Sequence, residues 1–447
     1  MSLETYVIKG STKVVDRFFE LPLDYSNESG PKIRVFVRHL IPLEKAKTLE
    51  EQEKLPYLLY LQGGPGAEVS LASALSLAPP IHEQGYQTLW LDPRGTGLST
   101  PFSADLVQGK SDQEIFEYLK HFRADNIVRD CEAIRKALLG GRKDPADQKW
   151  TILGQSFGGF CSLTYLSFFP GGLKEVFITS GLAPLGDHPD PVYLALEPKV
   201  TKRNKIYYQK YPADVKRVRN ILAFLDSNEV ALPNGGTLTP SRFLQLGMEF
   251  GSKGGIDHVH QIVLRSSNDL ELYGKLSYSL LQSIQSTQGM DGNPIFAILH
   301  EPIYCQGRAA NWSAERVLSK FPQYQWSHIK HASPDTPAYF FGEMVLPSVF
   351  DDFANLRPLK GAAELLARYS DWPKVYDLDQ LAKNEVKVTA ATYYDDIYVE
   401  FGLAQETAAV VKNTEQFISN EYFHGAIRTD GPVVFKQLFK LSKREYD

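Results

Sequence analysis

The sequence of 447 residues carries a net charge of −5, with 43% hydrophobic and 23% charged residues. These values are typical of a globular protein and exclude the strongly basic surface that nucleic-acid binding requires. The length exceeds that of one small core, so we expect a core with a second domain or a large insertion.

The cysteines and the N-terminal segment bear on the compartment of the protein. Three cysteines, Cys131, Cys161 and Cys305, are an odd number, which argues against a disulfide framework. Residues 1–10 have no basic segment followed by an apolar one, so we expect no signal peptide. No apolar run reaches the roughly 18 residues of a membrane span. We expect a cytoplasmic protein without nucleic-acid or membrane partners, and the oligomeric state stays open.

The first predicted elements alternate between strands and helices. Residues 32–40 alternate apolar and polar side chains, which predicts a half-buried strand. Short continuous apolar runs at residues 55–61, 86–91 and 150–153 predict strands buried on both faces, as in a parallel sheet. Residues 125–139 place apolar side chains on one stripe, which predicts an amphipathic helix. The succession predicts an α/β fold with a doubly wound, mostly parallel sheet.

This alternation stops near residue 182, where a long stretch rich in helix formers, aromatic residues and prolines begins. The alternation then returns as a strand, a helix, a strand and a final helix, at residues 386–394, 404–412, 415–422 and 432–443. We therefore predict a core made of residues 1–183 and 377–447. A mostly helical cap domain, residues 184–376, is expected to be inserted after the sixth strand.

The strongest chemical signal is the motif GQSFGG at residues 154–159. It follows the predicted strand at 150–153 and precedes residues 160–169, a predicted helix stopped by Pro170. A sharp turn from strand to helix exposes the central hydroxyl and requires small residues two positions to either side. The helix N-terminus beneath it favours negative charge. We therefore predict Ser156 as the nucleophile of an α/β-hydrolase fold.

A serine nucleophile needs a base, and this fold supplies its partners in the order serine, acid, histidine. Of the ten histidines, only His424 lies after the last predicted strand, so we predict that it is the base. The strand at 386–394 is followed by Asp395 and Asp396. Spacing alone leaves both open as the acid that orients the histidine. We favour Asp396, because the residues after it better fit the usual loop of this fold.

Acyl transfer also requires donors for the oxyanion of the tetrahedral intermediate, and these are often backbone N–H groups. The N–H of Phe157, directly after the nucleophile, is one candidate. The loop GGPG at residues 63–66 follows a predicted strand, and its glycines allow close approach to a substrate carbonyl. We predict Gly64 as the second donor, although the same four residues would also form an ordinary turn.

Four motifs together resemble the proline iminopeptidase (prolyl aminopeptidase) family of α/β-hydrolase serine peptidases. They are GGPG, DPRGTGLS, GQSFGG and HGAIRTDG, at residues 63–66, 92–99, 154–159 and 424–431. The segment LHEPIYC, residues 299–305, is similar to the cap of the eukaryotic branch. The resemblance implies release of an N-terminal residue, preferably proline, through an acyl-enzyme, with no cofactor and no metal.

The resemblance also implies that glutamates of the cap hold the free ammonium group of the substrate. Glu301 matches one of them by motif position, and Glu197 and Glu343 are further candidates that the sequence does not separate. A cationic amine that enters a closed pocket needs a paired anion, because its desolvation is otherwise too costly.

Two other functions are compatible with these residues. The first is a hydrolase of the same fold that acts on a small ester, amide or lactone, because a fold does not determine a substrate. Such an enzyme would cleave short acyl esters but not a proline arylamide. The second is a catalytically inactive α/β-hydrolase that serves as a binding protein, and a fluorophosphonate probe would not label its Ser156.

Overall fold

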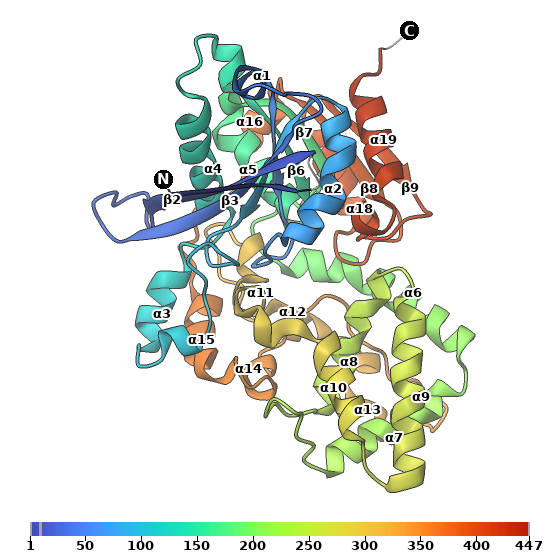
Figure 1. The fold of residues 1–447 in the computed structure, drawn as a ribbon. Helices are drawn as coiled ribbons and strands as arrows, with labels where there is room; N and C mark the ends of the chain where they lie inside the picture. Colours follow the sequence, from blue (N-terminus) through green and yellow to red (C-terminus); the bar gives the residue numbers. More distant parts are fainter. Residues whose placement is uncertain (1, 9–10, 446–447) are drawn as a thin grey trace.

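A nine-stranded sheet forms the centre of one half of the computed structural model, which describes residues 2–8 and 11–445 (Figure 1). The strand order is β1-β2-β3-β5-β4-β6-β7-β8-β9. The strands are β1 (Ser2–Ile8), β2 (Thr12–Pro22), β3 (Lys32–Pro42), β4 (Tyr57–Leu61), β5 (Gln87–Asp92), β6 (Trp150–Gln155), β7 (Leu173–Thr179), β8 (Lys387–Tyr393) and β9 (Thr414–Ser419).

The sheet is antiparallel at one end and parallel over the rest. β1, β2, β3 and β5 pair antiparallel in succession, whereas β5, β4, β6, β7, β8 and β9 pair parallel. Every residue of β4 and β6 is buried, because helices cover both faces of a parallel sheet. The predicted fold class, an α/β fold with a mostly parallel sheet, is confirmed.

Helices pack on both faces of the sheet (Figure 1). One face carries α2 (Leu71–Glu83), α18 (Ala426–Thr429) and α19 (Gly431–Ser442). The other face carries α4 (Ala124–Leu139), α5 (Phe157–Phe168), α16 (Leu378–Ala382) and α17 (Phe401–Val410). The stripe expected on residues 125–139 is the buried face of α4, where Ile127, Cys131 and Ile134 join the core.

Several strands differ from the sequence prediction. β1, β2 and β7 were not predicted, and β3 is more buried than a half-buried strand. In β3 the second face is covered as well: the ring of Phe36 contacts that of Phe18, and Arg38 forms an ion pair with Asp16 at 2.9 Å. An arginine can therefore be buried in this strand, because its charge is paired.

Most of the chain between β7 and β8, up to α15, forms a helical layer beside the sheet, whereas α16 packs on the sheet itself (Figure 1). Its α-helices are α6 (Asp190–Lys210), α7 (Asp214–Ser227), α8 (Pro240–Leu244), α9 (Gly255–Tyr273), α10 (Tyr278–Thr287), α11 (Pro294–Leu299), α12 (Ser313–Leu318), α13 (Trp326–Ile329), α14 (Val349–Asp352) and α15 (Lys360–Arg368). The layer follows β7, which is the seventh strand along the chain and the sixth if the N-terminal strand β1 is left out, whereas the insertion was predicted after the sixth strand. Its division from the core at 183/184 and 376/377 stays a prediction.

Two short helices complete the fold: α1 (Leu49–Lys54) precedes β4, and α3 (Asp112–Leu119) follows β5. Within residues 2–8 and 11–445, no helix combines the length and the apolar character needed to cross a bilayer.

Candidate active site

Ser156 lies at the sharp turn between β6 and α5. Its φ of 54° and ψ of −122° are unusual for a residue with a side chain, and such strain typically costs about 1–3 kcal/mol. The surrounding packing requires glycine: a Cβ on Gly154 would lie 2.3 Å from the carbonyl oxygen of Gly158, and a Cβ on Gly158 would lie 2.0 Å from that of Leu61. The turn thus has the geometry of a nucleophile elbow.

His424 and Asp396 complete a chain of hydrogen bonds that begins at Ser156. The Nε2 atom of His424 is 2.8 Å from the Oγ atom of Ser156, and its Nδ1 atom is 2.8 Å from the Oδ2 atom of Asp396. The hydroxyl of Ser180 donates to the carbonyl oxygen of His424 at 2.9 Å, and the ring of Tyr398 packs edge-on against the imidazole. The imidazole is therefore fixed from both sides of its ring and through its backbone.

The two aspartates after β8 have different environments. Asp396 is 2% exposed, and its Oδ1 atom accepts the backbone N–H groups of Tyr398 and Val399 at 2.8 and 3.1 Å. Asp395 instead forms an ion pair with Lys202 at 2.6 Å and is partly exposed. Only Asp396 is held by the backbone in an orientation that presents an oxygen to His424.

The electrostatic surroundings of His424 favour its protonated form. Burial alone would lower the pKa of the imidazole. The carboxylate of Asp396, through its charge and its hydrogen bond, and the charge of Glu343 outweigh that effect, so the pKa is raised above 6.5 despite the opposing charge of Arg428. A base with a raised pKa accepts a proton from a serine hydroxyl more readily.

Two backbone N–H groups next to Ser156 are available for an oxyanion. Phe157 begins α5, and neither its N–H nor that of Gly64 has an acceptor among the described residues. The N–H of Gly63, by contrast, donates to the Oε1 atom of Gln62 at 3.0 Å. The glycine loop lies against the nucleophile, because a Cβ on Gly63 would be 3.0 Å from the Cβ of Ser156.

Comparison with known proteins covers nearly the whole chain. Residues 56–223 match the model of the alpha/beta hydrolase fold. Proline iminopeptidase aneH of Aspergillus aculeatus is 40% identical over 451 residues, covering 97% of this chain and 98% of that protein. A proline iminopeptidase of Aeromonas sobria is 40% identical over 427 residues, covering 95% of this chain and 96% of that protein. The chain belongs to the proline iminopeptidase family.

Another relative matches only part of the chain. A tripeptidyl aminopeptidase of Streptomyces coelicolor is 26% identical over 206 residues, covering 38% of this chain and 35% of that protein. The proline iminopeptidase relatives, in contrast, match the sheet and the helical layer together.

In this member of the proline iminopeptidase family, the three candidate glutamates have different surroundings. Among the three, Glu343 is the glutamate whose charge contributes to the raised pKa of His424. After burial, its charge is also the largest contribution that raises the pKa of Tyr304 and of Tyr398. Its Oε2 atom is 3.6 Å from the Nε2 atom of His300, and its side chain is 20% exposed. Glu343 is therefore the candidate glutamate whose charge acts on His424.

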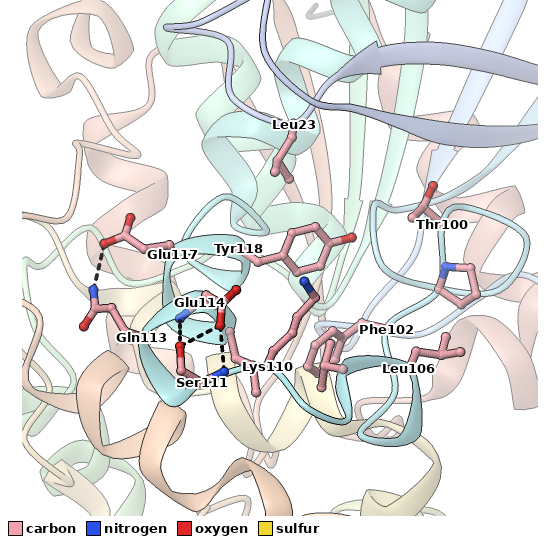
Figure 2. Close-up of a pocket in the computed structure, with 13 residues that line it drawn as sticks. Leu23, Thr100, Phe102, Leu106, Lys110, Ser111, Gln113, Glu114, Glu117 and Tyr118 are labelled. Atoms are coloured by element: carbon pink, nitrogen blue, oxygen red, sulfur yellow. Dashed lines mark hydrogen bonds between the residues drawn. The ribbon is translucent and has the colours of Figure 1, made fainter.

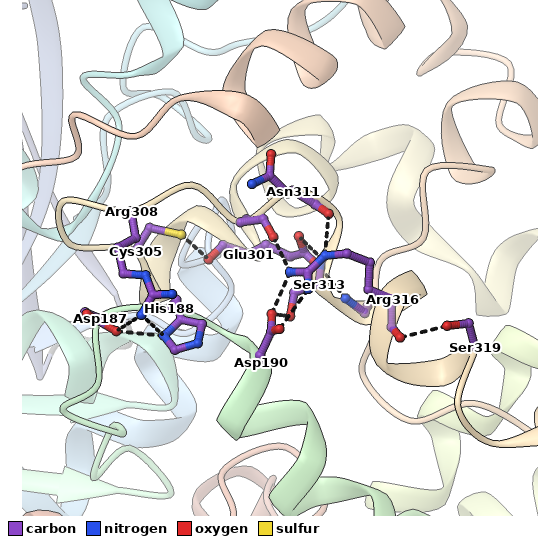
Figure 3. A network of polar contacts seen from close by, with 12 residues as sticks. Asp187, His188, Asp190, Glu301, Cys305, Arg308, Asn311, Ser313, Arg316 and Ser319 are labelled. Atoms are coloured by element: carbon purple, nitrogen blue, oxygen red, sulfur yellow. Dashed lines mark hydrogen bonds and ion pairs between the residues drawn. The ribbon is translucent and has the colours of Figure 1, made fainter.

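Glu301 is a buried helix cap (Figure 3). Its two carboxylate oxygens accept the N–H groups of Ser313 and Ala314 at 3.0 and 2.7 Å, at the first turn of α12. Nearby, Arg316 of the same helix pairs with Asp190 at 2.6 Å. Burial raises the pKa of Glu301 to about 7, against the effect of the two hydrogen bonds. Its carboxylate thus stabilises the positive end of α12.

Glu197 lies inside the helical layer. It is 8% exposed, and its Oε1 atom accepts the hydroxyl of Thr201 at 2.6 Å and the amide of Gln323 at 3.2 Å. The hydroxyl of Tyr324 is 3.4 Å away. The Oε1 atom of Glu197 thus has three neutral partners within the layer.

Sequence reasoning did not identify His300 or Arg428 as functional candidates. His300 lies near the two glutamates Glu301 and Glu343. Its Nδ1 atom is 3.3 Å from the hydroxyl of Tyr193, and the pKa of Tyr193 is raised by burial and by the charges of both glutamates. The signal for His300 was its position beside Glu301 in a motif. The signal for Arg428 was its position one helical turn after His424.

A separate apolar pocket of about 690 Å³ lies between α3 and the loop before it (Figure 2). Phe102, Leu106 and Tyr118 contribute apolar surface to it, and Leu23 closes one side. Its lining residues do not include Ser156 or His424.

Proposed function

We propose that this protein is a serine aminopeptidase that releases an N-terminal residue, preferably proline, from peptides. The observation that carries the proposal is the hydrogen-bonded chain from Ser156 through His424 to Asp396, with both distances at 2.8 Å, in a sequence 40% identical along its length to two proline iminopeptidases. We also propose a cytoplasmic location and a cap domain at residues 184–376, on the sequence alone.

The proposed reaction starts with proton transfer from Ser156 to the Nε2 atom of His424. The Oγ atom of Ser156 attacks the carbonyl carbon of the first residue, and the N–H groups of Phe157 and Gly64 bind the oxyanion. His424 then donates the proton to the leaving peptide amine, and water hydrolyses the acyl-enzyme with His424 again as base. Asp396 holds the imidazole and stabilises its cationic form.

The carboxylate of Glu343 is the group best placed to pair with the ammonium of the substrate. It lies close enough to His424 to affect its pKa, and its Oε2 atom is 3.6 Å from the Nε2 atom of His300, which is a weak contact. We assign Glu301 a supporting role, because its oxygens already accept two backbone N–H groups. Glu197 is the least favoured candidate, since its carboxylate is satisfied by neutral donors.

A comparison of substrates tests the activity. We expect hydrolysis of proline p-nitroanilide, slower hydrolysis of the alanine analogue, and no hydrolysis of N-acetylproline p-nitroanilide, because acetylation removes the ammonium. The Ser156→Ala variant should lose the activity and the labelling by a fluorophosphonate. Turnover of short acyl esters alone would contradict the aminopeptidase function and leave a different hydrolase of the same fold.

The assignment of the glutamates has its own test. Loss of one charge from a buried ion pair costs about 2 kcal/mol or more, so Glu343→Gln should raise the KM for proline p-nitroanilide about 30-fold or more. The rate of labelling by a neutral fluorophosphonate should change far less, because that probe has no ammonium. Glu197→Gln is the matched control, and an equal rise in KM there would refute the assignment.

A further inference from the structure

Arg428 connects two segments that carry the proposed catalytic groups. It lies in α18, four residues after His424. Its Nη2 atom donates to the Oε1 atom of Gln62 at 2.9 Å and to the Oε1 atom of Gln155 at 3.0 Å. One cationic nitrogen therefore holds two amide oxygens, which come from the ends of the neighbouring strands β4 and β6.

Gln62 anchors the glycine loop. Its Oε1 atom also accepts the N–H of Gly63 at 3.0 Å and the hydroxyl of Tyr60 at 3.1 Å, and its Nε2 atom donates to the carbonyl oxygen of Glu68 at 3.0 Å. The amide thus binds the loop before and after residues 64–67. A buried amide with these partners fixes the peptide plane that precedes the N–H of Gly64.

Gln155 connects the same cation to the nucleophile. It is 1% exposed and immediately precedes Ser156. Its Oε1 atom would lie only 2.5 Å from a Cβ on Gly63, so the amide packs directly against the glycine loop. Without Arg428, the amide oxygens of Gln62 and Gln155 would lose their shared donor, and the two strand ends could shift relative to each other.

We propose that Arg428 is a positioning residue that fixes the glycine loop to the nucleophile turn, so that the N–H groups of Gly64 and Phe157 point to one oxyanion. The inference rests on the proposed roles of Ser156 and these two donors, and it adds a residue that acts through Gln62 and Gln155. Arg428 is an exposed residue outside the apolar core, so we expect proteins with a replacement at this position to fold.

Arg428→Gln and Arg428→Lys test the proposal, with Arg357→Gln as a matched control. Arg357 is also an exposed arginine. Unlike Arg428, it donates to backbone carbonyl oxygens, those of Asp351 and Gly235 in the helical layer. A shift of an oxyanion donor typically costs about tenfold to a hundredfold in rate. We expect this fall in kcat for Arg428→Gln on proline p-nitroanilide, with KM held within about twofold, and a similar fall in the fluorophosphonate labelling rate.

The pH profile of labelling separates the loss of the charge of Arg428 from the loss of its hydrogen bonds. The charged groups that act on His424 are Asp396 and Glu343, which raise its pKa, and Arg428, which lowers it. Arg428→Gln should therefore move the acid limb to higher pH, whereas Arg428→Lys should keep the limb in place and recover part of the rate.

Each outcome decides the question. Unchanged kcat and labelling in Arg428→Gln would overturn the proposal. Equal losses in the glutamine and lysine variants, together with a lower Tm and an unmoved pH limb, would also overturn it and indicate a structural role. If the wild-type protein is labelled at Ser156 but does not cleave proline p-nitroanilide, the aminopeptidase function fails, and the labelling rates alone still test Arg428.

Discussion

At the scale of single residues, the paired aspartates after β8 give the sharpest test of the site. Asp396→Asn would present an amide to the Nδ1 atom of His424 and favour the wrong tautomer, so kcat should fall by about 10⁴-fold. Asp395→Asn should keep nearly full activity, because Asp395 contacts Lys202 instead. Steady-state kinetics on proline p-nitroanilide measure both variants, and equal losses would contradict the assignment.

The pKa of His424 determines the acid limb of the activity. His424 acts as a base only when it is neutral, and its pKa is raised above 6.5, so activity should fall as the pH decreases through a value above 6.5. Glu343→Gln removes a charge that raises this pKa and should move the limb to lower pH. Fluorophosphonate labelling between pH 5 and 9 measures the shift without needing an ammonium group. A limb that moves upward in Glu343→Gln would disprove the proximity of Glu343 to His424.

Ser156 and His424 could be proposed because their order is a property of the chain itself, whereas spacing alone left Asp395 and Asp396 both open as the acid. The glutamates could not be ranked in the same way. The surroundings of Glu343 come from His300 and His424, which are distant in sequence and meet it only after the helical layer packs on the sheet. The capping role of Glu301 depends on where α12 begins, which the motif around Glu301 does not reveal.

At the scale of elements, the turn between β6 and α5 depends on close contact with β4. Alanine normally stabilises a helix relative to glycine, by about 1 kcal/mol. Gly158→Ala should do the opposite, because its Cβ would lie 2.0 Å from the carbonyl oxygen of Leu61. We expect the free energy of unfolding to fall by about 1–3 kcal/mol, together with a loss of labelling at Ser156.

Gly171→Ala is the control for that substitution, since a Cβ there has no atom within 4 Å. Denaturant unfolding followed by circular dichroism compares the two variants. A Gly158→Ala protein as stable and as reactive as the Gly171→Ala protein would show that the elbow tolerates the extra carbon.

The elements that were predicted are those whose pattern is local. β4 and β6 are continuous apolar runs, and α4 has an apolar stripe. Burial of a strand on both faces and burial of a helix on one face can therefore both be recognised in the sequence. β7 was missed because the charged residues Lys174 and Glu175 interrupt its apolar run, and because it is ordered by pairing with β6 and β8, the second of which is distant in sequence. The edge strand β1 and its neighbour β2 were also missed, because β1 is ordered by pairing with β2, and β2 by pairing with β3.

At the scale of the whole molecule, one buried arginine ties the sheet to the helical layer. Arg123, just before α4, donates to the carbonyl oxygens of Pro302 and Cys305 at 2.8 and 2.6 Å and to that of Pro373 at 2.8 Å. Its guanidinium also lies over the ring of Trp372. Pro302 and Cys305 lie in the middle of the layer and Pro373 lies near the return to the sheet, so Arg123 anchors these two parts of the layer.

Arg123→Met should therefore weaken the attachment of the layer. Each buried carbonyl left without a donor costs about 1–3 kcal/mol, so we expect a clearly lower Tm and faster proteolytic cleavage between β7 and β8. Arg142→Met is the matched control, because Arg142 also donates to backbone carbonyls and lies over an aromatic ring, but its partners Glu53, Leu55, Asp147 and Tyr57 all belong to the sheet half. Cleavage at the wild-type rate in Arg123→Met would rule out this anchoring role.

The wide separation of Ser156 and His424 along the chain has a consequence for biosynthesis. The ribosome makes the histidine 268 residues after the serine, which at about 5–20 residues per second takes roughly 15 to 50 s. During that interval the strained hydroxyl has no partner to activate it. A nascent chain therefore cannot carry out the proposed reaction until translation has passed the entire helical layer and reached His424.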